Sequence, residues 1–193
     1  MPRASAADAA ETARRVREVA GERFAAEGFG TASVDDIARR AGVTRGAVYH
    51  HYDGKLGLFR AVVESLQSEI AARVVAEAEK QTDAAAQLRA GSHAFLDAIT
   101  DDRAARVLLV DAPAALGLPQ WRELDAAASG RELREAIVAL GTVVPELVDA
   151  LTAQLSGAMN EAALWLADRP GDERARAAAH AALDLVLDAI APR

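Results

Sequence analysis

Apolar residues recur three or four positions apart along most of the chain, with few strict alternations of apolar and polar residues. This spacing is typical of helices that bury one face, and proline and glycine mark the breaks between them. The sequence therefore predicts an all-α protein. We expect helices at about 5–27, 33–41, 44–52, 55–80, 83–99, 102–111, 120–140, 145–168 and 172–190, with Pro113, Pro119, Pro145 and Pro170 at or near their boundaries.

The first predicted helix carries signals at both of its ends. Ser5 and Asp8 have the spacing of a capping box, which satisfies backbone N–H groups of the first turn. Gly28 ends the helix, because glycine readily adopts the left-handed conformation of a helix end. Phe29 then lies where it packs back on Phe24, an apolar contact that accompanies this type of end.

Two short helices follow and meet at a glycine turn. Ser33 and Asp36 form a second predicted capping box, and Gly42 ends this helix. Thr44 is the expected N-cap of the next helix, only two residues later. Two short helices joined by so tight a turn have the layout of a helix-turn-helix.

Two histidines and two tyrosines lie in the stretch GVTRGAVYHHYDGK, residues 42–55, and raise the question of a metal or catalytic site. Adjacent histidines on a helix point about 100° apart, whereas a two-histidine metal face needs them four apart with a third ligand. No nucleophile or paired carboxylate accompanies them for acid–base chemistry. A small helical-bundle, metal-dependent enzyme that uses His50 and His51 is therefore the alternative hypothesis.

The helix that begins at Thr44 has two different faces. Val48 and Tyr52 continue the apolar face begun at Val43, so we expect them to pack on the first two helices. The opposite face is shallow because Gly46 adds no bulk, and its hydrogen-bond donors suit a nucleic-acid groove. This face carries Thr44, Arg45, Ala47, Tyr49, His50 and His51. Arg45, at the helix start, is the best candidate for contacting a guanine.

The net charge of −7 argues against nucleic-acid binding only if it is taken over the whole chain. Residues 1–60 contain ten Lys or Arg and eight Asp or Glu, a net charge of +2, whereas residues 61–193 contain twelve and twenty-one, a net charge of −9. This asymmetry leaves the first segment free to approach a polyanion.

The remaining composition narrows the chemistry further. The chain has no cysteine, which excludes disulfides, thiolate metal sites and thiol nucleophiles. It has neither a run of 18 uncharged apolar residues nor the apolar core of a secretory signal, so we expect no membrane partner and a cytoplasmic protein. We also expect neither a metal nor a cofactor.

The segment from about Glu11 to Phe59 resembles the DNA-binding domain of the TetR (tetracycline-repressor-like) family of bacterial transcription regulators. Nearly fifty residues carry the resemblance in register, above all IARRAGV, RGAVYHHY and the Lys-x-x-Leu-Phe entry to the fourth helix. It implies a helix-turn-helix DNA-binding domain at residues 1–54 and a helical effector-binding and dimerisation domain at residues 55–193.

The resemblance also implies roles for individual residues. The positions that approach bases are Thr44, Arg45 and Ala47, with Gly46 between them. The positions that touch the phosphate backbone are Tyr49, His50, Lys55, Thr31 and Ser33. Helix N-termini, where Ser33 and Lys55 lie, are favourable phosphate sites because of their free N–H groups and positive dipole end.

The sequence departs from the family pattern in three ways. Tyr52 stands where phenylalanine is usual, Asp53-Gly54 replaces a Pro-Ser-like pair, and Gly57 replaces an acidic helix former. The tyrosine hydroxyl needs a hydrogen-bond partner if the ring is buried. Gly57 is expected to weaken the first turn of the fourth helix by up to about 1 kcal/mol relative to alanine. The direction of the Lys55 side chain depends on how the chain enters this helix.

One short recognition helix contacts few base pairs, so specificity is normally gained by dimerisation on a palindrome. We expect residues 145–190 to form the homodimer interface, because small and apolar residues recur on one face of each of two helices. These stripes are Leu147, Leu151, Leu155, Ala158, Ala162 and Trp165, and Ala175, Ala178, Ala182, Leu185 and Ala189. The alternative is that both stripes pack inside one subunit.

The body keeps polar residues among apolar ones, and the resemblance implies that it binds an unidentified small-molecule effector, so we expect four of its residues to line one cavity. They are His93, Trp121, Met159 and Asn160. A lone histidine or asparagine in such helices is more often a core group with an internal hydrogen bond. The resemblance thus implies a repressor that binds a double-stranded DNA operator and is released by the effector. A non-specific DNA-packaging protein, a third hypothesis, is disfavoured by the acidic body.

Overall fold

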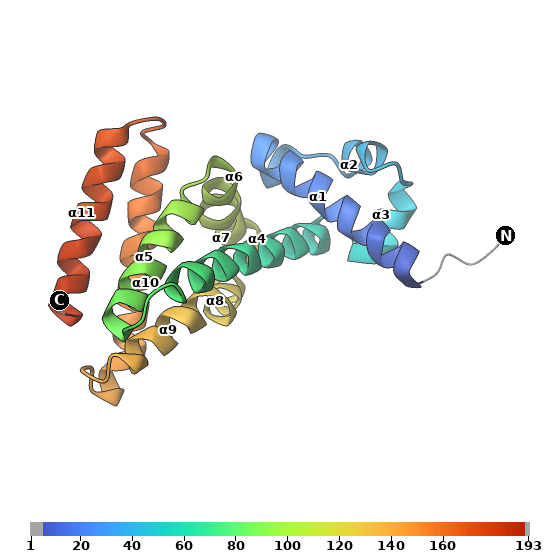
Figure 1. Ribbon diagram of the computed structural model, residues 1–193. Coiled ribbons are helices and arrows are strands. Elements are labelled where there is room, and N and C mark those ends of the chain that lie inside the picture. The colour runs from blue at the N-terminus through green and yellow to red at the C-terminus, as the bar shows by residue number, and fades with distance from the viewer. Residues whose placement is uncertain (1–5, 192–193) are drawn as a thin grey trace.

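The computed structural model describes residues 6–191, and the regular structure within them is all helical, as predicted. The first helices are α1 (Ala6–Thr31), α2 (Val34–Arg40), α3 (Arg45–Tyr52) and α4 (Lys55–Ala78). Figure 1 shows α1, α2 and α3 grouped as a head at one end of the molecule, with α4 running from this head into a larger body. Ser5, one of the predicted caps, lies outside the described residues.

The body contains eight further helical segments in the described part of the chain. They are α5 (Ala84–Ile99), α6 (Asp102–Ala104), the π-helical segment η1 (Ala105–Asp111), α7 (Ala112–Leu116), α8 (Leu118–Ala127), α9 (Ser129–Ala139), α10 (Pro145–Ala167) and α11 (Glu173–Ile190). In Figure 1, α5 lies alongside α4, and α10 and α11 form the hairpin farthest from the head. No helix among the described residues is both long enough and apolar enough for a membrane crossing.

Two segments of the body differ from the expected helices. The predicted helix at 120–140 is divided at Ala128, which has non-helical φ and ψ angles of −115° and −108°. The segment expected as one helix at 102–111 consists of α6 and η1 and continues as α7. α8 packs on α7, whereas α9 buries Leu133 and Ile137 against α4, α5 and α10. The break follows from this tertiary packing, which local periodicity does not report.

The first helix does not end at Gly28 as predicted: α1 bends sharply there and continues to Thr31. Gly28 has a φ of 81°, and a Cβ there would collide with the guanidinium of Arg106. The bend brings the ring of Phe29 within 6.0 Å of the Phe24 centroid, which confirms the predicted contact. Both rings pack on Phe59 of α4, at centroid distances of 4.7 and 5.0 Å. This aromatic cluster joins the head to α4.

The same bend is bonded to the body through η1. The backbone N–H of Phe29 donates to the carboxylate of Asp111 at 3.0 Å. Arg106 donates to the carbonyl of Ala26 at 3.3 Å, and its guanidinium lies 3.8 Å from Asp111. These contacts attach the end of α1 to a segment more than 75 residues further along the chain.

The capping box predicted for α2 is wrong. Ser33 occupies the N-cap position, but its side chain makes no capping hydrogen bond. The carboxylate of Asp36 instead contacts the guanidinium groups of Arg23, Arg39 and Arg40. Charged hydrogen bonds of this kind are stronger than a bond to a neutral backbone N–H. The hydrogen bond from Arg40, aided by the other two charges, lowers the pKa of Asp36.

The junction of α3 and α4 explains the three departures noted in the sequence. The hydroxyl of Tyr52 donates to the carbonyl of Ala13 at 2.5 Å, which supplies the partner that a half-buried tyrosine needs. Asp53 and Gly54 both have positive φ, and they turn the chain directly into α4. A Cβ at Gly57 would overlap the carbonyl oxygen of Tyr52. Gly57 is therefore required by close packing, a role that its helix propensity alone does not indicate.

We expect Gly57→Ala to destabilise the protein by about 1–3 kcal/mol, because the added methyl group forces α3 and α4 apart. Urea unfolding followed by circular dichroism measures this change. Gly46→Ala is the matched control, since its Cβ would meet nothing closer than 3.8 Å in an exposed helix. The control is expected to gain up to about 1 kcal/mol from helix propensity. Equal stability of the Gly57→Ala protein and the original would contradict the packing role.

Candidate nucleic-acid interface

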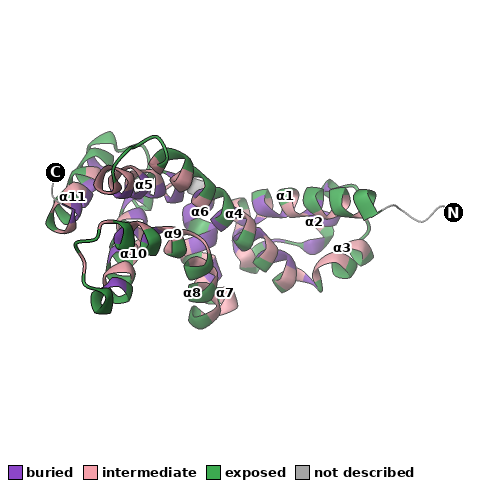
Figure 2. Cartoon of the chain, turned by 60° about the horizontal axis from the view of Figure 1, so that its bottom comes forward, coloured by how far each residue is buried: buried purple, intermediate pink, exposed green. Residues whose placement is uncertain are grey.

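The polar face of α3 lies on the surface of the head, as its pattern predicts. Val48 on the opposite face is fully buried. The exposed residues are Thr44, Arg45, Gly46, Tyr49 and His50, with Ala47 half-buried among them. Figure 2 shows α3 at the edge of the head, with exposed residues on its outer side. Thr44 is the predicted N-cap, and its hydroxyl accepts a hydrogen bond from the N–H of Ala47 at 3.2 Å.

Arg45 is held on this surface by two neighbours. Its guanidinium lies 3.1 Å from the carboxylate of Asp35 on α2 and donates to the hydroxyl of Tyr49 at 3.3 Å. It also lies over the Tyr49 ring, 5.3 Å from the centroid. The hydrogen bond to Tyr49 and the charge of Asp35 raise the pKa of Arg45, so this side chain remains cationic. Arg45 is thus exposed, charged and restrained in direction.

The residues predicted to touch phosphates at the helix entries lie close together. Lys55 donates to the carbonyl of Gly30 at 3.0 Å, and its ammonium lies 4.9 Å from the centroid of the Phe29 ring. This bond places the first residue of α4 beside Thr31, the last residue of α1. Thr31 and Ser33 are both exposed. Their hydroxyls, the N-terminus of α2 and the Lys55 ammonium together form a polar edge next to α3.

His50 and His51 do not converge on one point. Their ring centroids are 5.4 Å apart and their planes are inclined by 63°. His50 is exposed, whereas His51 is half-buried and lies beside the Tyr52 ring. Over residues 6–191 no group of three or more His, Asp or Glu side chains is arranged to hold a metal ion. The geometry therefore gives the metal-enzyme alternative no third ligand at this pair.

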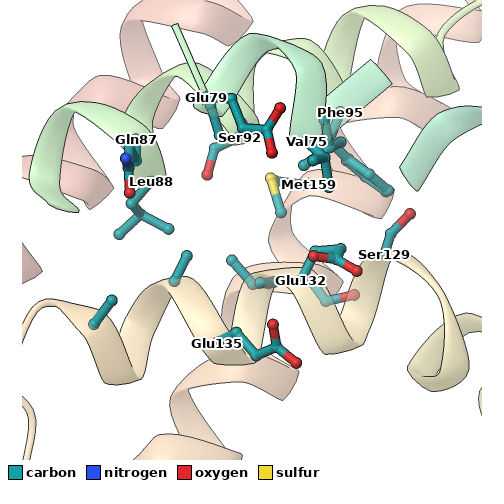
Figure 3. A pocket seen from close by; sticks show the side chains of 17 residues that line it. Val75, Glu79, Gln87, Leu88, Ser92, Phe95, Ser129, Glu132, Glu135 and Met159 are labelled. Carbon is teal, nitrogen blue, oxygen red and sulfur yellow. The ribbon is translucent and has the colours of Figure 1, made fainter. Parts of the chain in front are cut away.

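The body contains a cavity of about 270 Å³ that opens to the surface between α4, α5, α9 and α10. Figure 3 looks into it, with Ser92, Phe95 and Met159 on one side and Glu132 and Glu135 of α9 on the other. Its walls are mainly apolar. The apolar lining residues are Val74, Val75, Ala78, Leu88, Gly91, Phe95, Leu133, Ala136, Ala139 and Met159.

The prediction that four body residues share one cavity is wrong. Only Met159 lines the cavity of Figure 3. Trp121 and Asn160 line a separate groove of about 800 Å³ against α8, α9 and α10. His93 lines neither. Successive helical residues point about 100° apart, so the cavity receives Ser92 while its neighbour His93 faces another helix.

His93 belongs to a hydrogen-bonded chain that ties α5 to α11. Its Nδ1 lies 2.7 Å from Nδ1 of His180, and its Nε2 lies 3.1 Å from the Asp184 carboxylate. His180 continues the chain to Asp97, 2.9 Å away. The hydrogen bond from His93, with help from Arg89, lowers the pKa of Asp184. His93 is therefore a satisfied interhelical group, the more common role of a lone histidine.

An apolar surface remains exposed on the outer hairpin. Trp165 of α10 and Leu185 and Val186 of α11 are 40%, 75% and 45% exposed. Between them runs a groove whose floor includes Leu155, Ala179 and Leu183 and whose edges include Ala158, Ala178 and Ala182. Of the predicted dimer stripes, Leu155 and Ala175 are buried within the subunit, and Leu151 and Ala162 are half-buried. The other stripe residues are exposed.

Two family models match the chain. Residues 16–62 match the model of bacterial regulatory proteins of the tetR family, and residues 85–190 match the tetracyclin repressor-like C-terminal domain. The HTH-type transcriptional regulator SrpR of Pseudomonas putida is 52% identical over 67 residues, which are 35% of this chain and 32% of SrpR. The HTH-type transcriptional regulator AcrR of Shigella flexneri is 39% identical over 70 residues, which are 36% of this chain and 33% of AcrR. The matched segments thus span about a third of these relatives.

A solved structure matches along nearly the whole length. It is a TetR-family transcriptional regulator from Pectobacterium atrosepticum, with 30% sequence identity and a TM-score of 0.77. The superposition covers 98% of this chain and 99% of that chain. The family and these relatives are transcriptional regulators and not enzymes. The matched head, the matched body and the exposed polar face of α3 agree: the chain belongs to the TetR family of DNA-binding transcriptional regulators.

Proposed function

We propose that this regulator is a homodimeric repressor that binds a palindromic operator in the cytoplasm and is released by a small molecule in the body. In this proposal residues 1–54 form the DNA-binding domain and residues 55–193 the effector and dimerisation domain. The observation that carries it is the exposed, cationic and restrained Arg45 on the polar face of α3. Selection of bound duplexes from random DNA tests it, and the expected result is one enriched palindrome. No enrichment of any duplex would overturn it.

On the DNA, the N-terminal part of α3 enters the major groove. Thr44, Arg45 and Ala47 approach base edges, because Gly46 has no side chain to hold the helix away from the bases. Arg45 donates to a guanine. The phosphate contacts come from Tyr49, His50, Lys55, Thr31 and Ser33. Tyr49, His50, Thr31 and Ser33 are exposed, which supports this assignment. For Lys55 the support is its position in the polar edge beside α3. Phosphate contacts set the register, and the base contacts supply the specificity.

The exposed hairpin face supports dimerisation through α10 and α11. Alanines along its edges allow close helix approach, and Trp165, Leu185 and Val186 supply apolar surface that is unfavourable in water. Two such hairpins related by a two-fold axis form a four-helix interface. This arrangement pairs two heads, so each α3 contacts one half-site of a palindrome one helical turn apart.

α4 supports communication between the cavity and the head. Its first half buries Leu58, Phe59 and Val62 beneath the head, and its last turns place Val74 and Ala78 in the cavity wall. An effector that binds better to a different orientation of α4 changes the separation of the two heads. Shifting the ratio of the DNA-binding state to the non-binding state from 99:1 to 1:99 requires the effector to bind the non-binding state more tightly by about 5.5 kcal/mol.

The Arg45→Ala change is expected to weaken operator binding by about 1–3 kcal/mol and to relax base preference, because it removes a base contact. Lys55→Ala is expected to weaken all duplexes and to flatten the salt slope by about one unit, because it removes a phosphate contact. Fluorescence anisotropy over a salt series measures both. Lys80→Ala is the matched control, because Lys80 follows the far end of α4 and pairs with Glu77. Unchanged base preference in Arg45→Ala contradicts the base contact.

We expect Asp35→Asn to tighten binding to non-specific duplexes by about two- to fivefold at low salt, because it frees Arg45 from its ion pair. Filter binding with a scrambled duplex measures the change. Asp53→Asn removes the same charge elsewhere on the head surface and is the control. Identical affinities in the two variants would show that the Asp35–Arg45 pair does not compete with DNA.

Leu185→Arg is expected to give monomers that lose operator affinity at least tenfold, since a buried unpaired arginine in the interface is costly. Sedimentation velocity measures the oligomeric state. Val138→Arg replaces an equally apolar residue of α9 that is 53% exposed, and it is expected to leave the dimer intact. A stable Leu185→Arg dimer contradicts the proposed interface.

A further inference from the structure

The cavity of Figure 3 combines an apolar interior with an acidic rim. Drug-sized ligands occupy pockets of about 300–1,000 Å³, so a cavity of about 270 Å³ suits a smaller molecule. Glu79, Glu132 and Glu135 are among its lining residues, whereas Lys, Arg and His are absent from that set. The described lining therefore favours an apolar ligand body and disfavours a carboxylate or phosphate group.

The cavity also contains a buried polar group with no partner. Ser92 is 4% exposed, and its hydroxyl oxygen makes no hydrogen bond within the described part of the protein. Leaving such a group unsatisfied is costly, by about 1–3 kcal/mol. Ser92 lines the cavity, and Figure 3 shows it on the same side as Glu79. A ligand with a polar head at this end would satisfy the hydroxyl.

Close packing brings Ser92 and Glu79 together. A Cβ at Gly91 would lie 3.3 Å from the Val74 side chain and 3.8 Å from that of Ala78. The α5 turn that carries Ser92 therefore lies against the last turn of α4, which Glu79 directly follows. The hydroxyl and the carboxylate thus approach the cavity from neighbouring turns of two helices.

The charge of this rim is only partly compensated. Arg131 lies outside the cavity lining and pairs with Glu132, 2.6 Å away, and its charge also acts on Glu135. One guanidinium against three carboxylates leaves the rim negative. The Glu132 side chain is 20% exposed, so its field is less screened than that of a fully solvated carboxylate. A cation at the rim is favoured by this field.

We propose that the cavity binds a small cationic amphiphile. Its apolar body lies among Leu88, Phe95 and Met159, and its ammonium group lies at the acidic rim, where it donates to the Ser92 hydroxyl and to Glu79. This inference rests on the proposed ligand-responsive function and names the chemical class of its effector. Neutral molecules of the same shape gain the apolar contacts and at most a hydrogen bond to Ser92 without the attraction of the carboxylates, and anionic ones are repelled by the rim.

Three probes of equal chain length test the head group: n-octylammonium, n-octanol and n-octanoate. Isothermal titration calorimetry with the full-length protein is expected to give at least about fivefold tighter binding of octylammonium than of octanol. Octanoate is expected to bind most weakly. Equal or tighter binding of octanoate overturns the inference, and so does the absence of saturable binding for all three.

Two variants locate the binding site. Glu79→Gln is expected to weaken octylammonium about threefold or more while leaving octanol unchanged, because it removes only charge. Glu77→Gln makes the same change in net charge outside the cavity lining, where Glu77 pairs with Lys80, and is expected to change neither. Ser92→Ala is expected to weaken octylammonium by about fivefold through the lost hydrogen bond. Equal effects of Glu79→Gln and Glu77→Gln overturn the site.

A parallel titration of the protein–operator complex separates this inference from the proposed function. Selective octylammonium binding without operator release supports the ligand class and contradicts effector release. Operator release by octanol or octanoate at lower concentrations than by octylammonium overturns the ligand class and leaves effector release standing.

Discussion

The burial of α4 at both of its ends, in the head and in the body, is the constraint on which the other features depend. At the head, Leu58, Phe59 and Val62 are buried, and Phe59 contacts both Phe24 and Phe29. In the body, α4 packs along α5 and supplies one wall of the cavity. A helix of this kind cannot rotate or slide at one end without disturbing apolar contacts at the other, because one closely packed core surrounds it from the head to the body. The recognition face and the cavity are therefore mechanically connected by one element.

A second connection runs through the bend of α1. Gly28 allows the bend, and the freed N–H of Phe29 donates to Asp111. Arg106 contacts both Asp111 and the carbonyl of Ala26. Arg106 and Asp111 both belong to η1, which is a π-helical segment. Segments of this kind are often found at functional sites. The head is thus attached to the body on two sides, by apolar packing along α4 and by polar bonds at η1.

Much of the head was predictable because its signals are local. The Thr44 cap, the buried Val48, the exposed Arg45 and Tyr49 and the Phe24–Phe29 contact all follow from spacing within a few residues. The body site was not predictable in this way. The sequence analysis assigned His93 to the cavity. In the structure His93 contacts His180 on α11, and its neighbour Ser92 lines the cavity instead. A helical period identifies faces, but it does not say which neighbour each face meets.

The sequence by itself determined the helical class, most helix boundaries, the polar face of α3 and the family of the protein. These features depend on periodicity, caps and a dense motif, which are properties of short segments. Only the tertiary structure decided that Asp36 binds three arginines instead of capping α2, and that Gly57 is required by the carbonyl of Tyr52. The division of the segment 120–140 and the membership of the cavity were decided in the same way. Each of these depends on contacts between residues that only the packing of whole helices brings together.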